Sequence, residues 1–65
     1  MSQFYAQEAD EQKCQRSSIS GTTITINGRT TDGVIRVFTG IVQSVEKGHT
    51  AYSGYPLRIT MPNSN

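Results

Sequence analysis

Residues 34–46 have the sequence Val-Ile-Arg-Val-Phe-Thr-Gly-Ile-Val-Gln-Ser-Val-Glu, the longest run of strand-forming residues in the chain. Successive side chains of a strand point to opposite faces, so the alternation predicts one apolar face, made up of Ile35, Val37, Ile41 and Val45. Three more apolar residues have the opposite parity: Val34, Phe38 and Val42. The run is long for one strand, and Gly40 is the residue at which the backbone can bend or bulge. We therefore predict two strands separated by a kink at Gly40.

Two other segments show the same alternation. Residues 22–26 place Ile24 and Ile26 on one face and Thr23 and Thr25 on the other, and residues 55–61 place Tyr55, Leu57, Ile59 and Met61 on one face. Asn27-Gly28 and Asp32-Gly33 are both typical of tight hairpin turns, which need residues with positive φ. Residues 29–31 lie between these turns, and they form either a short edge strand or part of a single loop over residues 27–33.

The composition supports a mainly β domain. Six Ile, four Val and eight Thr make 18 of the 65 residues β-branched, whereas Leu occurs once. β-branched side chains fit a pleated surface better than a helix. None of them lies in residues 1–16, which also lack Gly and Pro. That segment is predicted to be either a short N-terminal helix or a flexible lead-in.

These observations predict an all-β domain, or a mainly β domain with a short N-terminal helix. Residues 17–61 would form a small bent antiparallel meander of four or five strands, followed by a tail over residues 62–65. Closure into an SH3-like or Sm-like barrel is the first expectation, and a flatter meander paired with a second copy is the alternative. The expected core consists of Ile24, Ile26, Ile35, Val37, Ile41, Val45, Tyr55, Leu57, Ile59 and Met61.

That core is small for a chain with few other means of stabilisation. Domains of this size usually need a disulfide, a metal or oligomerisation. Cys14 is the single Cys and His49 the single His, so neither an internal disulfide nor a Cys/His metal site is expected. We therefore expect a homo-oligomer, a dimer or larger, or binding to another protein. The predicted interface residues are Val34, Phe38 and Val42.

Residues suited to catalysis are few and scattered. His49 falls in a predicted polar turn, where a histidine is usually solvated. Cys14 has acidic neighbours, which do not activate a thiol. The nearby acids lie on the lead-in segment, where positioning for acid–base chemistry is poor: Glu8, Asp10 and Glu11. We expect a non-enzymatic protein without a cofactor or a metal ion.

A single-stranded nucleic acid is the alternative partner. Arg36, Phe38 and Arg58 have the outward parity of neighbouring predicted strands, and Arg29 lies in an adjacent loop. Aromatic and basic side chains on a small barrel bind single strands by stacking and charge neutralisation. Arginines on a strand are also typical of sheet edges that resist aggregation. Nucleic-acid binding is therefore the alternative to association, and an enzyme with its site between subunits is a third possibility.

Charge and hydropathy limit the remaining classes. A formal net charge of +1 argues against a strongly electrostatic binder of nucleic acid or membranes. No apolar run is long enough to cross a bilayer, and residues 1–20 lack the apolar stretch of a signal peptide. With one Cys and neither of these segments, we expect a cytoplasmic protein that does not bind membranes.

Overall fold

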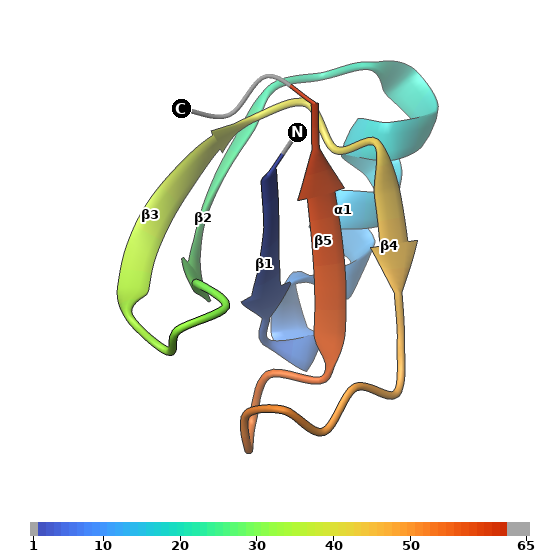
Figure 1. Cartoon of the computed structure of the whole chain (residues 1–65). Helices are drawn as coiled ribbons and strands as arrows, with labels where there is room; N and C mark the ends of the chain where they lie inside the picture. The colour runs from blue at the N-terminus through green and yellow to red at the C-terminus, as the bar shows by residue number, and fades with distance from the viewer. Residues whose placement is uncertain (1, 63–65) are drawn as a thin grey trace.

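The computed structural model describes residues 2–62. Its elements follow the order β1 (Ser2–Ala6), 3₁₀ helix η1 (Glu8–Asp10), α1 (Glu11–Ser20), β2 (Ile24–Arg29), β3 (Ile35–Gly40), β4 (Ser44–Glu46) and β5 (Leu57–Met61). The five strands form one antiparallel sheet in the order β3-β2-β1-β5-β4 (Figure 1). The prediction of a small, mainly β domain is confirmed. Within residues 2–62 no ladder joins the edge strands β3 and β4, so closure into an SH3-like or Sm-like barrel is not confirmed.

The connection between β3 and β4 forces the sheet to curl. Only residues 41–43 separate these two edge strands. In a flat sheet, the four strand spacings from β3 to β4 would measure about 19 Å. The four residue steps from Gly40 to Ser44 reach at most about 14 Å. The chain therefore crosses one end of a curled sheet from edge to edge (Figure 1), and Val42, in the middle of the crossing, is 2% exposed.

The first residues are part of the sheet rather than a helix or a lead-in. β1 lies in the centre, pairs with β5 along its whole length and pairs with β2 at Tyr5 and Ala6. Phe4 and Ala6 are fully buried, whereas Gln3 is exposed. The five residues of β1 include no β-branched side chain, so their sequence gave little indication of a strand. They form one because they pair with strands on both sides, and not because of local propensity. The helix follows, from Glu11 to Ser20, and so extends into the segment assigned to the β domain.

The hairpin between β2 and β3 turns at one of the two predicted positions. Asp32-Gly33 lies in the turn, and Gly33 has a φ of 92°. The predicted turn at Asn27-Gly28 is wrong, since both residues lie within β2 and pair with β3. Gly28 serves packing instead: a Cβ there would lie 2.5 Å from Cδ2 of Phe4 and 2.8 Å from the carbonyl oxygen of Tyr5.

The predicted break at Gly40 is confirmed, because β3 ends there and β4 begins four residues later. The predicted inward face of this run is wrong in β3. Ile35 and Val37 are 54% and 65% exposed, and Ile41 is 43% exposed. Phe38 instead turns toward the core and stacks on Phe4, with ring centroids 3.9 Å apart. Apolar residues of both parities occur here, so the alternation could not decide which face is buried.

The core lies inside the curl, between the sheet and α1. Its buried apolar side chains are Phe4, Ala6, Cys14, Ile26, Val42, Leu57, Ile59 and Met61. The expected burial of Ile26, Leu57, Ile59 and Met61 is confirmed, and Ile24 and Val45 pack against the core while partly exposed. Tyr55, also expected inside, is half-buried and lies against Arg29. Pro62 is exposed, and the rest of the predicted tail lies outside the described residues.

A buried hydroxyl fastens α1 to the crossing. Ser17 Oγ donates a hydrogen bond of 2.6 Å to the carbonyl oxygen of Thr22 and accepts one of 3.0 Å from the backbone N–H of Val42. Ser18, one residue further on, is exposed and donates a hydrogen bond of 3.1 Å to the carbonyl oxygen of Gln43. The helix thereby holds the segment that makes the sheet curl.

Gly28→Ala should destabilise the fold by about 2–3 kcal/mol, because the backbone of Tyr5 cannot move away from the new methyl group. Asn27→Ala, at the exposed neighbouring position, should change the free energy of unfolding by about 0.5 kcal/mol or less. Urea denaturation of the parent and both variants measures the difference. Equal midpoints for the two variants would show that the approach of β1 to β2 is looser than described.

Ser17→Ala should cost about 1–3 kcal/mol, because it leaves the buried N–H of Val42 without its acceptor. Ser18→Ala is the matched control on the same helix, and it should cost clearly less because water can replace its exposed hydrogen bond. Thermal unfolding followed by circular dichroism compares them. A loss at Ser18 as large as that at Ser17 would contradict the assigned role of the Ser17 hydroxyl.

Candidate association surface

The exposed apolar residues concentrate on one segment. Among residues 2–62 the exposed large hydrophobic side chains are Ile19 (85%), Val34 (45%), Ile35 (54%), Val37 (65%) and Ile41 (43%). Four of these five belong to β3 and its two flanking residues. β3 is also an edge of the sheet, at the side of the molecule away from α1 (Figure 1). We call Val34, Ile35, Val37 and Ile41 the β3 strip.

The backbone of β3 presents free hydrogen-bonding groups along the same edge. Thr30 N–H donates to the carbonyl oxygen of Val34 at 2.8 Å, so these two residues form a hydrogen-bonded pair. In an antiparallel ladder such pairs alternate with pairs whose N–H and C=O groups point away from each other. The register of β2 with β3 therefore directs the groups of Ile35, Val37 and Thr39 away from β2, toward the open edge. An edge of this kind is a template for another strand.

The opposite edge is better protected. β4 contains three residues and packs against α1. Lys47, just beyond its end, forms an ion pair of 3.0 Å with Glu11 of α1. Short edge strands and covering helices are two ways in which proteins prevent strand addition. β3 is thus the more accessible edge within the described part of the chain.

The three residues predicted to form an interface have different environments. Val34 is exposed at the start of β3. Phe38 is half-buried and stacks on Phe4, whereas Val42 belongs to the core. The sequence prediction assigned Ile35 and Val37 to the core, whereas both are exposed on the outer face of β3. Ile35 and Val37 are the residues of an edge strand whose backbone groups point away from its one neighbour. Such residues can be identified only once the strand order is known.

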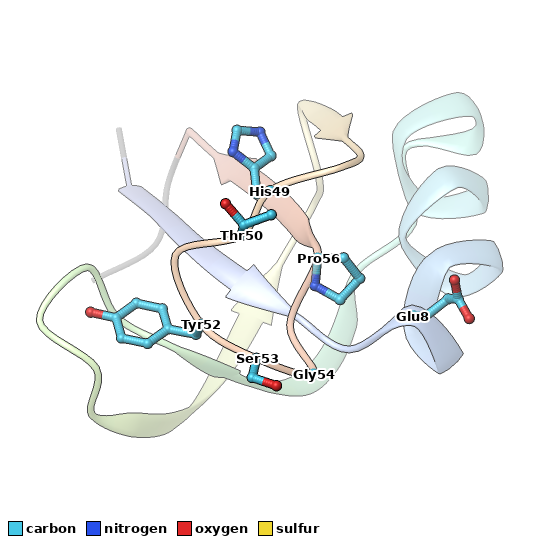
Figure 2. A pocket seen from close by; sticks show the side chains of 7 residues that line it. All are labelled: Glu8, His49, Thr50, Tyr52, Ser53, Gly54 and Pro56. Carbon is cyan, nitrogen blue, oxygen red and sulfur yellow. The ribbon is translucent and has the colours of Figure 1, made fainter.

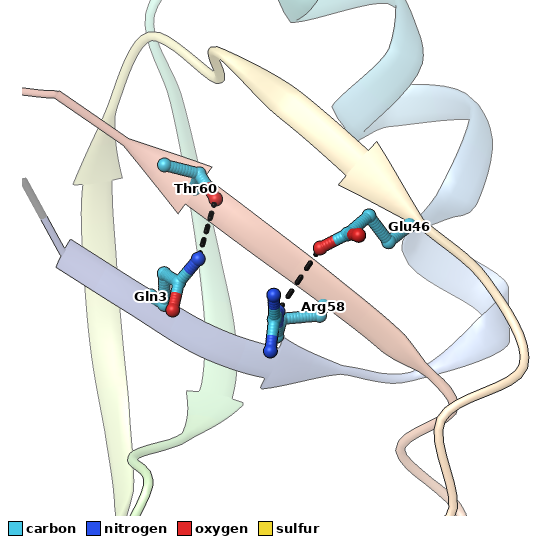
Figure 3. Close-up of polar contacts among 4 residues, drawn as sticks. All are labelled: Gln3, Glu46, Arg58 and Thr60. Atoms are coloured by element: carbon cyan, nitrogen blue, oxygen red, sulfur yellow. Dashed lines mark hydrogen bonds and ion pairs between the residues drawn. The ribbon is translucent and has the colours of Figure 1, made fainter.

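The residues predicted to bind nucleic acid do not share a face. Arg36 and Phe38 have the parity that points to the inner side of the curl, opposite Gly28 and Ile26. Arg58 lies on the outer face and forms an ion pair of 3.0 Å with Glu46 (Figure 3). Beside this pair, Gln3 Nε2 donates a hydrogen bond of 3.4 Å to Thr60 Oγ1. No single surface collects Arg36, Phe38 and Arg58.

Arg29 is part of an aromatic cluster on the outer face. Its guanidinium carbon lies 5.8 Å and 5.0 Å from the ring centroids of Tyr52 and Tyr55. The Tyr52 ring contacts Tyr5 edge-on at 5.5 Å, and its hydroxyl donates a hydrogen bond of 2.7 Å to the carbonyl oxygen of Thr31. These contacts join the long segment between β4 and β5 to the sheet.

A hollow lies beside the same segment. It measures about 510 Å³ and is lined by Glu8, His49, Thr50, Tyr52, Ser53, Gly54 and Pro56 (Figure 2). Figure 2 shows the Glu8 carboxylate and the His49 imidazole directed away from each other. The His49 ring contacts Tyr5 edge-on at 6.0 Å. The two titratable groups are therefore not arranged as an acid–base pair.

Cys14 is enclosed in the core, and its thiol is expected to be unreactive. The pKa of its thiol is raised to about 11, mainly by burial and in part by the negative charge of Asp10, while the positive charge of Lys13 partly opposes both. A thiol with a raised pKa stays protonated and reacts slowly. Within residues 2–62, no three His, Cys, Asp or Glu side chains are grouped closely enough to hold a metal ion.

Comparison with known proteins adds no relative. The chain matches no family model, no curated protein and no solved structure. No helix in the described residues has the length and apolar character needed to cross a membrane.

The pKa of Cys14 predicts how stability changes in alkaline solution. The folded thiol ionises near pH 11 and the unfolded thiol near pH 9, so between these values the folded state binds more protons. Stability should fall as the pH rises through this window. Cys14→Ala should remove this part of the pH dependence, although it lowers stability at neutral pH. Urea titrations of parent and variant from pH 8 to about pH 10.5 test the prediction, and parallel curves would contradict it.

Proposed function

We propose that this chain is a small non-enzymatic domain that acts by self-association, through strand addition at the free edge of β3. The observation that carries the proposal is the coincidence of two features at the same residues. Ile35 and Val37 direct unpaired backbone groups to the edge, and their side chains are 54% and 65% exposed. Strand addition uses main-chain hydrogen bonds for affinity and alternate side chains for specificity.

The size of the domain supports the same function. Its buried apolar set is small for a chain of 65 residues that has a single, unpaired Cys. Domains of this size are often stabilised by association, which adds buried surface that one copy cannot provide. The net charge of +1 opposes contact between two copies only weakly. As part of the proposal, we expect the domain to work in the cytoplasm, where a lone thiol stays reduced.

Binding of a single-stranded nucleic acid has less support. Arg58 is separated from Arg36 and Phe38, and its charge is paired with Glu46. The outer-face aromatic rings already contact one another and Arg29. Stacking on bases requires rings with a free face next to unpaired positive charge. Tight, salt-sensitive binding of a labelled oligonucleotide by a monomeric parent would reverse this preference.

Val37→Lys should weaken association by about tenfold or more, which corresponds to about 1.4 kcal/mol or more. The side chain is exposed in one copy, so the fold should tolerate the lysine, whereas charges at a shared strand edge block pairing. Ile19→Lys is the matched control, since Ile19 is more exposed but lies on α1. Light scattering over a range of concentrations measures the mass of each protein.

The parent and Ile19→Lys should show a mass above 7.1 kDa that increases with concentration. Val37→Lys should remain near 7.1 kDa. A parent that is monomeric at the highest concentration would contradict the proposed function. So would an Ile19→Lys variant that dissociates as readily as Val37→Lys, because the contact would then lie on α1.

A further inference from the structure

We infer that the strand added to β3 is β3 of a second copy, antiparallel to the first, with Val37 at the two-fold axis and a closed dimer as the result. This inference rests on the proposed function, because it specifies how the free edge is used. It adds the identity of the partner strand, the register and the number of copies.

The two edges of the sheet determine which strand is available. Strand addition needs a partner with its own open edge, and β4 is short and packs against α1. A contact from β3 to β4 of the next copy would also leave one free edge at each end, and such head-to-tail contacts build open filaments. A contact between two β3 strands uses the same patch twice and closes after two copies. The protected β4 edge therefore favours the dimer.

The direction of the backbone groups restricts the register. Ile35, Val37 and Thr39 direct their N–H and C=O groups outward, so each must lie opposite one of the same three residues. With Val37 opposite Val37, Ile35 lies opposite Thr39 of the second copy and all three positions pair. With the two-fold axis at Arg36 or at Phe38 instead, only two hydrogen-bonded residue pairs lie within β3. The register centred on Val37 therefore forms the most hydrogen bonds.

The side chains favour the same register. On the inner side, Arg36 lies opposite Phe38 of the second copy, where a guanidinium can cover the exposed part of the ring. Phe38 is half-buried because its other face stacks on Phe4. Val34 lies opposite Gly40, which has no side chain to obstruct it. An axis at Arg36 would instead place two guanidinium groups directly opposite each other, which is unfavourable.

Cysteine cross-linking in the full chain tests this arrangement. Directly opposite residues of a hydrogen-bonded antiparallel pair have Cα atoms about 5.5 Å apart, a separation that a disulfide spans. Val37→Cys should therefore form a covalent dimer with itself on mild oxidation. Ile35→Cys and Thr39→Cys should each fail to do so alone, yet they should cross-link when mixed. The parent is the control, since Cys14 is fully buried and should not react.

Light scattering of each reduced variant first establishes that it still associates, with a limiting mass of about twice 7.1 kDa. Self-linking of Ile35→Cys or of Thr39→Cys, or a mixture that does not cross-link although both variants associate, would overturn the register. A mass that grows beyond two copies would overturn the closed dimer. Either result leaves self-association through β3 intact, whereas a monomeric parent overturns both proposals. If the Val37→Cys substitution itself prevents association, cross-linking between Ile35→Cys and Thr39→Cys tests the register instead.

Discussion

The short crossing from β3 to β4 is the constraint on which the rest of the structure depends. Three residues join the two outermost strands of a five-stranded sheet, and they can do so only if the sheet curls. The curl brings Phe38 of β3 onto Phe4 of β1, two strands away, at 3.9 Å. It also places Val42 under α1, where Ser17 holds its backbone N–H. The packing of the core, the position of α1 and the path of residues 41–43 therefore depend on one another.

The curl also decides what remains outside. One face of the sheet has to enclose the core, so the other face of β3 is turned to solvent along its whole length. Val37 and Ile35 lie there because their parity opposes that of Phe38. The same register leaves their backbone groups unpaired. The exposed side chains of Ile35 and Val37 and the outward direction of their backbone groups thus both follow from the register of β2 with β3.

The sequence predicted the class of the fold better than the place of its parts. β-branched residues and alternation located β2, β3 and β5, and Gly40 marked the end of β3. β1 was missed because Phe4 and Ala6 owe their strand to partners that are distant in the chain. Asn27-Gly28 was assigned to a turn because the need for a residue without a Cβ beside Phe4 is invisible until β1 is placed. The predicted inward face of residues 34–46 was wrong in β3 for a related reason: both faces of this run carry apolar residues, and the strand order decides which face is buried.

The comparison of β2 with β3 gives the strongest reason to regard the β3 strip as functional. Both strands share the outer face, and neither needs apolar side chains there to build the core. β2 has Thr25 and Asn27 at these positions, both exposed. β3 has Ile35 and Val37 instead, on the strand that lacks a second neighbour and where protective Lys or Pro residues are usual. Its one charge, Arg36, has the inner parity, so it does not interrupt the apolar outer face at Ile35 and Val37. Exposed apolar residues at a sheet edge are an aggregation hazard unless a partner covers them, so their presence on β3, and not on β2, favours an edge that is normally paired.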